Sequence, residues 1–114
     1  MNTQEIAHQI INALEEKQAE NILLLDIQEI ASFTDYFIIC TGSSNRMLRA
    51  LADEIENKAR TELNIKTKAQ GHPDSGWITL DLGDIVVHFF SPEQREFYSL
   101  EELWDEGKAL VRMQ

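Results

Sequence analysis

Residues 77–90 contain two apolar runs that meet at a glycine and an aspartate, and this stretch constrains the fold most. The first run is WITLDL and the second is IVVHFF, with Gly83 and Asp84 between them. Runs rich in β-branched and aromatic residues favour strands, and a glycine-aspartate pair between two such runs is typical of a two-residue hairpin turn. The sequence therefore predicts an antiparallel hairpin, in which Leu82 lies opposite Ile85 if Gly83 and Asp84 form the turn. A turn centred on Leu82 and Gly83 would give the same two faces.

The two faces of this hairpin differ in composition, because side chains alternate along a strand. One face is wholly apolar and belongs in the core: Ile78, Leu80, Leu82, Ile85, Val87 and Phe89. The other face is mixed: Trp77, Thr79, Asp81, Val86, His88 and Phe90. Either a terminal helix covers the mixed face and leaves Asp81 and His88 at its solvated rim, or the face is a protein-binding patch. Aromatic anchors amid polar groups are typical of such patches.

Hydrophobic periodicity predicts the elements that precede the hairpin. Apolar residues at helical spacing predict amphipathic helices over residues 3–17, with Thr3 as a cap, and over residues 44–62. The run NILLLDI at 21–27 predicts a short buried strand, and residues 35–41, apolar on both faces, predict an interior strand.

Weaker signals predict the remaining elements. Residues 65–69 alternate and predict an edge strand, whereas residues 71–76 predict a loop. A Ser-Pro-Glu sequence at Ser91 predicts the start of a helical turn, and Ser99 with Glu102 has the spacing of a capping box. This order of elements, ending in short helices, indicates an α/β layer packed on a mixed sheet.

The segment CTGSSNR at 40–46 follows a predicted strand and begins a predicted helix, as phosphate-binding loops do. It lacks the lysine of a Walker loop and the G-x-G-x-x-G of a dinucleotide fingerprint, and the chain contains no Asp-x-Asp for a catalytic metal. Serine is also a preferred helix cap and glycine a common turn residue. We interpret the segment as a structural corner, with Gly42 easing the turn and Ser43 or Ser44 capping the helix.

Composition limits the classes of protein to consider. The length of 114 residues suits one domain spanning residues 1–114. Ten basic against twenty acidic residues give a net charge of −10, which opposes binding to nucleic acid or anionic lipid and favours a basic or neutral partner. The longest apolar runs are too short to span a bilayer, and the N-terminus lacks the features of a secretion signal, so we expect a cytoplasmic protein.

Neither catalytic nor cofactor-binding motifs stand out. Cys40 is the only cysteine and lies in an apolar run, which predicts a buried and inert thiol. The three histidines, His8, His72 and His88, are scattered and have no partner at metal-ligand spacing. We therefore expect no metal, no cofactor and no enzymatic activity.

Three segments together resemble one protein family: TDYFIICTGSSNR, GWITLDLGDIVVHFF and REFYSLEELW. The combination of their motifs is specific, and the likeness covers residues 3 to about 108. On these motifs the chain resembles the bacterial ribosomal silencing factors, a group that also includes the plant Iojap protein and mitochondrial relatives.

The resemblance implies an α/β fold with a mixed five-stranded sheet flanked by helices, related to nucleotidyltransferases but without their catalytic carboxylates. It further implies a protein that binds the large ribosomal subunit through large-subunit ribosomal protein fourteen, at the surface where the small subunit would dock. Occupying that surface would prevent the subunits from joining and would repress translation when nutrients are short.

The resemblance also implies a binding patch around the hairpin: Trp77, Asp81, Leu82, Asp84 and His88. Four of these lie outside the core by our assignment of faces, and Leu82 is the exception unless it protrudes at the hairpin tip. Gln70 and Thr79 depart from the family's usual glutamate and larger aliphatic residue.

Two alternatives use the same features differently. The chain could be a self-associating scaffold, or a homodimer, that pairs through the mixed hairpin face. It could instead be a degenerate nucleotidyltransferase-like protein that still binds a nucleotide at the Gly-Ser loop. A dimer that hides Trp77, or heat released on adding nucleoside triphosphates with magnesium, would distinguish them.

Overall fold

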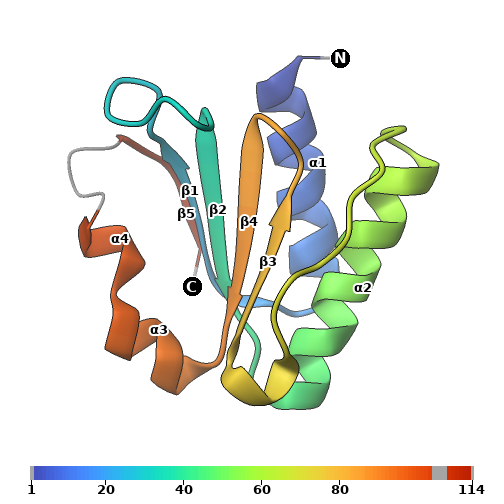
Figure 1. Ribbon diagram of the computed structural model, residues 1–114, viewed down its shortest axis with the longest axis vertical. Coiled ribbons are helices and arrows are strands. Elements are labelled where there is room, and N and C mark those ends of the chain that lie inside the picture. The colour runs from blue at the N-terminus through green and yellow to red at the C-terminus, as the bar shows by residue number, and fades with distance from the viewer. Residues whose placement is uncertain (1, 104–107, 114) are drawn as a thin grey trace.

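The computed structural model describes residues 2–103 and 108–113. Its elements are α1 (Thr3–Glu16), β1 (Glu20–Asp26), β2 (Tyr36–Thr41), α2 (Asn45–Thr61), the short 3-10 helix η1 (Pro73–Ser75), β3 (Trp77–Asp81), β4 (Ile85–Phe90), α3 (Pro92–Tyr98), α4 (Leu100–Leu103) and β5 (Lys108–Met113). Helices α1 and α2 cover one face of the sheet, and α3 and α4 lie on the opposite side (Figure 1). No helix among the described residues is long and apolar enough to cross a membrane.

The sheet has five strands in the order β3-β4-β2-β1-β5. Strands β2 and β4 pair in parallel, and every other neighbouring pair is antiparallel. A parallel pair needs a crossover connection, and the segment from α2 to β3 supplies it here. The predicted mixed five-stranded sheet flanked by helices is therefore confirmed.

The prediction of an edge strand at 65–69 is wrong. The backbone of this segment forms hydrogen bonds with partners other than a neighbouring strand. The backbone N–H of Ala69 donates to the carboxylate of Glu56 at 2.7 Å instead of to a neighbouring strand. A single bridge remains beside β3, where Gln70 and Thr79 exchange backbone hydrogen bonds of 2.8 and 2.9 Å. This contact is made by the backbone and does not depend on the identity of either side chain.

The fifth strand is β5, which lies at the far edge of the sheet and pairs with β1. The sequence pattern predicts that the chain ends in short helices, and this strand shows that the prediction is wrong. Helices α3 and α4 do occur, but they precede the strand. Antiparallel pairing with the buried strand β1 gives the segment a structure that its own sequence pattern did not indicate.

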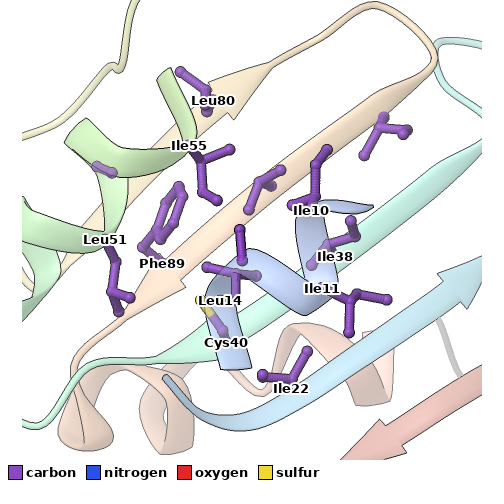
Figure 2. Close-up of a cluster of buried hydrophobic side chains, with 14 of the residues drawn as sticks. Ile10, Ile11, Leu14, Ile22, Ile38, Cys40, Leu51, Ile55, Leu80 and Phe89 are labelled. Carbon is purple, nitrogen blue, oxygen red and sulfur yellow. The ribbon is translucent and has the colours of Figure 1, made fainter. Parts of the chain in front are cut away.

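The principal core lies between the sheet and the two long helices (Figure 2). Ile10 and Leu14 of α1, and Leu51 and Ile55 of α2, belong to the same fully buried cluster as Phe89 of β4. Burying large aliphatic and aromatic side chains contributes roughly 1.5–3 kcal/mol each to folding. This cluster therefore fixes the helices on the sheet.

Two smaller predictions about this core are also confirmed, the buried thiol of Cys40 and the interior strand, β2, with apolar side chains buried on both faces. The side chain of Cys40 is fully buried, and burial raises the pKa of its thiol to about 12, so the group is inert. A second cluster lies on the opposite face of the sheet, and its buried members are Leu23, Leu25, Ile27, Phe37, Ile39, Phe90 and Leu100.

The hairpin has the predicted register. The backbone N–H of Leu82 donates to the carbonyl of Ile85 at 2.8 Å, and Asp81 pairs with Val86. Gly83 has a φ of 93°, as the first central residue of a type II′ turn requires. The assignment of the two hairpin faces follows from this register and is therefore confirmed.

The helix caps show where local sequence decides the structure. Asn2, and not Thr3, caps α1, whereas Ser44 caps α2 and Ser91 caps α3 as predicted. The predicted capping box at Ser99 is wrong: this residue ends α3 with a φ of 45°, and its hydroxyl donates to the Glu96 carbonyl. Trp104, which the box was expected to precede, lies outside the described residues.

Removing the hydroxyl of Ser44 should test the corner at the start of α2. The Ser44 Oγ accepts a hydrogen bond from the Met47 N–H at 3.1 Å, and loss of such a cap costs about 1 kcal/mol. We expect Ser44→Ala to lower the free energy of unfolding in urea by about that amount. Ser43→Ala, one residue outside the cap, should change it by less than about half as much, and equal losses would contradict the assignment.

Candidate functional site

Trp77 at the start of β3 is held by contacts on several sides. Its indole Nε1–H donates to Nδ1 of His88 at 3.2 Å. Its ring stacks on Phe90 at a centroid distance of 5.0 Å and meets Tyr98 of α3 at 4.6 Å. The side chain is nevertheless only half-buried. The indole therefore presents a fixed, partly exposed aromatic surface.

His88 does not lie at a solvated rim, which is where one of the two interpretations of the mixed face placed it. His88 is only 6% exposed. The centroid of its ring lies 4.6 Å from that of Phe37, and the two rings are nearly perpendicular. The reason is that β4 is an interior strand, so His88 lies between Thr79 of β3 and Ile39 of β2. The imidazole can therefore serve a binding surface mainly through the indole that it holds.

The hydrogen bond from Trp77 defines the tautomer of this histidine. Because Nδ1 accepts, the proton of the neutral ring lies on Nε2, which is buried and has no hydrogen-bond partner among the described residues. Burial also lowers the pKa of His88 to about 4, because the charged form would lose its hydration. The ring is thus neutral at pH 7.

The other predicted residues lie around the hairpin turn. Asp81 and Asp84 are exposed, and a carboxylate oxygen of Asp81 accepts the Gly83 N–H at 2.8 Å. Leu82 is 9% exposed and belongs to the principal core, so it does not protrude. At about 3.3 Å per residue, Asp81 lies roughly 13 Å along the strand from Trp77.

Four of the five predicted residues therefore form two groups, and Leu82 lies in the core apart from both. The structure brings Trp77 and His88 together beside α3, and it brings Asp81 and Asp84 together at the turn. Alternation in the sequence could not show the neighbour that completes the first group, Tyr98, because it comes from a different element. The only sequence signal for it was the Phe-Tyr pair in REFYSLEELW.

The Gly-Ser corner is poorly suited to binding phosphate. A cleft of about 390 Å³ does lie there, lined by Ser43, Ser44 and Asn45. The carboxylates of Asp74 and Glu93 line the same cleft, and Asn45 donates to Asp74 at 3.2 Å. An anion would therefore meet two negative charges. Among the described residues, no group of three or more His, Cys, Asp or Glu could hold a metal ion.

The buried imidazole predicts a pH-dependent stability. His88 titrates near 6.5 when the chain is unfolded and near 4 when it is folded, so the unfolded state binds more protons between these values. The free energy of unfolding should therefore fall as the pH drops through this window. For this group we expect a loss of about 2 kcal/mol between pH 7 and pH 5.

Urea unfolding of the parent and of His88→Leu at both pH values isolates that contribution. The variant removes the titrating group, so the stability difference between the two proteins should change by about 2 kcal/mol across the interval. A difference that stays constant from pH 7 to pH 5 would mean that the imidazole is not held neutral by burial.

Comparison with known proteins identifies the family. The profile described as "Ribosomal silencing factor during starvation" (RsfS) matches residues 1–114. The chain is 39% identical to ribosomal silencing factor RsfS of Bacillus subtilis, over 94% of this chain and 91% of that protein. It is 31% identical to mitochondrial assembly of ribosomal large subunit protein 1 of Mus musculus, over 83% of this chain and 43% of that protein.

A solved structure agrees with this assignment. A crystal structure of a protein from Chromobacterium violaceum superposes with a TM-score of 0.86 at 34% identity, covering 97% of this chain and 94% of that one. The match of the family profile extends over the whole chain, and the sequence and structure comparisons cover most of it. The chain belongs to the RsfS family of ribosomal silencing factors.

Proposed function

We propose that this ribosomal silencing factor binds the large ribosomal subunit through large-subunit ribosomal protein fourteen and thereby blocks docking of the small subunit. The consequence would be repression of translation when nutrients are short, in the cytoplasm where ribosomes work. Support for a large-subunit partner comes from the family and from the name of the mouse relative, which refers to assembly of that subunit.

The fixed and partly exposed indole of Trp77 is the observation that carries the proposal. Interface hot spots are enriched in tryptophan and tyrosine, and rigid aromatic side chains lose little conformational entropy on binding. The contacts with His88, Phe90 and Tyr98 hold the indole in one orientation before any partner arrives. A preorganised anchor of this kind favours a protein contact.

Charge supports a protein contact over an RNA contact. The chain carries a net charge of −10, and Asp81 and Asp84 are exposed on the hairpin that also carries Trp77. Carboxylates repel the phosphates of ribosomal RNA and attract a basic protein surface. We propose that the aspartates steer the hairpin onto the basic ribosomal protein and that Trp77 then supplies most of the affinity.

Self-association through the same surface is compatible with this proposal. A homodimer that covered Trp77 would compete with the ribosome by mass action, so binding would depend on protein concentration. The affinity measurements below should therefore be made with the oligomeric state determined at the same concentration.

Truncating the indole should remove most of the binding. We expect Trp77→Ala to lower affinity for isolated large subunits by at least roughly 30-fold, equivalent to about 2 kcal/mol. Because the ring also packs on Phe90 and Tyr98, some loss of folding stability is expected, and urea unfolding must show that the variant remains folded. Leu110→Ala, on β5 at the opposite edge of the sheet, is the matched control.

Trp77→Phe separates the anchor from its hydrogen bond. This variant keeps an aromatic ring for packing but cannot donate to His88, so we expect an intermediate affinity. If folded Trp77→Ala binds large subunits as tightly as the parent, the indole is not the anchor and this part of the proposal is wrong.

Neutralising the hairpin carboxylates should act on the rate of association. Asp81→Asn and Asp84→Asn should each slow association with large subunits by at least about twofold at low salt, with little change in dissociation, because exposed charges mainly steer encounter. The difference should disappear at high salt. Glu16→Gln removes the same charge from the end of α1, and an equal effect there would indicate that net charge alone matters.

A further inference from the structure

Phe97 on α3 is the most exposed of the large hydrophobic side chains in the described part of the chain. It is 77% exposed, compared with 61% for Phe33, 43% for Tyr98 and 40% for Leu110. A single exposed phenylalanine needs no explanation by itself. The position of Phe97 does need an explanation, because this residue ends a series of ring contacts that begins in the core.

We call this series the aromatic row, and its members are Phe90, Trp77, Tyr98 and Phe97. The row starts at Phe90, which is fully buried in the second cluster, and continues through Trp77 and Tyr98. The ring of Phe97 then meets that of Tyr98 edge-on, at 5.1 Å and 86°. The proposed anchor therefore continues without interruption onto α3.

Hydrogen bonds at both ends of α3 hold this helix against the sheet. Ser91 caps its first turn, and the Ser91 N–H donates to the Gly76 carbonyl at 2.9 Å, next to Trp77. Towards the other end, the guanidinium of Arg95 donates to the Thr41 hydroxyl at 3.0 Å and to the Asn21 carbonyl. Phe97 is thus presented on a fixed helix, as an effective binding residue must be.

Two exposed carboxylates lie on the same short helix as the exposed ring. Glu93 precedes Phe97 by four residues, so the two side chains lie on the same side of the helix. Glu96 is adjacent in sequence, and both carboxylates are exposed. A cation over an aromatic face is attracted by the ring quadrupole, and a nearby carboxylate adds to that attraction.

We infer that Phe97 and Glu93 form a seat for an arginine or lysine side chain of a basic protein partner. The inference rests on the proposed function, since the partner is the same ribosomal protein, and it extends the binding surface from β3 onto α3. The carboxylates and the net charge of −10 argue for this occupant, because they would repel a phosphate.

Substitutions at Phe97 distinguish a cation seat from an ordinary apolar contact. Phe97→Leu keeps the apolar surface but removes the ring, so affinity for isolated large subunits should fall about fivefold. Phe97→Trp supplies the aromatic ring that attracts cations best and should bind at least as tightly as the parent. Glu93→Gln should weaken binding about twofold at low salt.

Two controls match these changes. Leu110→Ala truncates another exposed apolar side chain on β5, and Glu16→Gln removes a carboxylate at the end of α1. Neither should alter affinity by more than the experimental error. Because Phe97 is largely exposed, its variants should unfold in urea close to the parent midpoint, which verifies that they remain folded.

The outcomes separate this inference from the proposed function. If Phe97→Leu binds like the parent while Trp77→Ala binds poorly, the seat on α3 is overturned and the proposed function stands. If Phe97→Leu and Phe97→Trp lose affinity equally, the contact is apolar and shape-specific, and the cationic occupant is overturned. If the parent does not bind large subunits at all, the proposed function fails and the seat fails with it.

Discussion

The position of β4 between β2 and β3 is the constraint on which the rest of the structure depends. Parallel pairing with β2 and antiparallel pairing with β3 occupy both edges of the strand, and side chains from both of its faces are buried in the two clusters. Phe89 then enters the principal core against α1 and α2, whereas His88 and Phe90 support Trp77 on the other side. The same strand therefore stabilises the fold and orients the proposed anchor.

Much of this arrangement could be predicted because it is local in sequence. Alternation along the hairpin and the Gly83-Asp84 turn fix the register, and the register fixes which side chains share a face. Ser44 and Ser91 cap helices through hydrogen bonds that span three residues. In each case, the partners lie within one turn or one hairpin of each other.

The errors in prediction concern contacts between distant segments. One of the two interpretations of the mixed face placed His88 at a solvated rim, but Phe37 of β2 and Trp77 of β3 pack against it. The alternation of one hairpin contains no information about β2. The strand β5 exists because β1 offers a free edge, and the segment at 65–69 fails to form a strand because Glu56 of α2 binds the Ala69 N–H. The contact between Tyr98 and Trp77 also joins distant segments, because the fold brings α3 back across the start of β3.

The Gly-Ser corner and the hairpin have different roles in this account. The corner resembles a phosphate-binding loop in sequence, but its Ser44 caps α2 and carboxylates line the cleft beside it, which favours a structural role. The exposed groups suited to a partner gather instead on the hairpin and α3. An acidic chain with a preorganised aromatic surface is suited to a basic protein on the ribosome, which agrees with membership of the RsfS family.

Subunit joining is the most direct test of the central claim. Purified small and large subunits should be mixed with and without the protein, at a concentration that saturates the large subunit, and separated by sedimentation in a density gradient. The account predicts that the peak of joined ribosomes falls and that the protein sediments with the free large subunit. A joined peak of unchanged size, with the protein bound to it, would contradict the claim that binding blocks the small subunit.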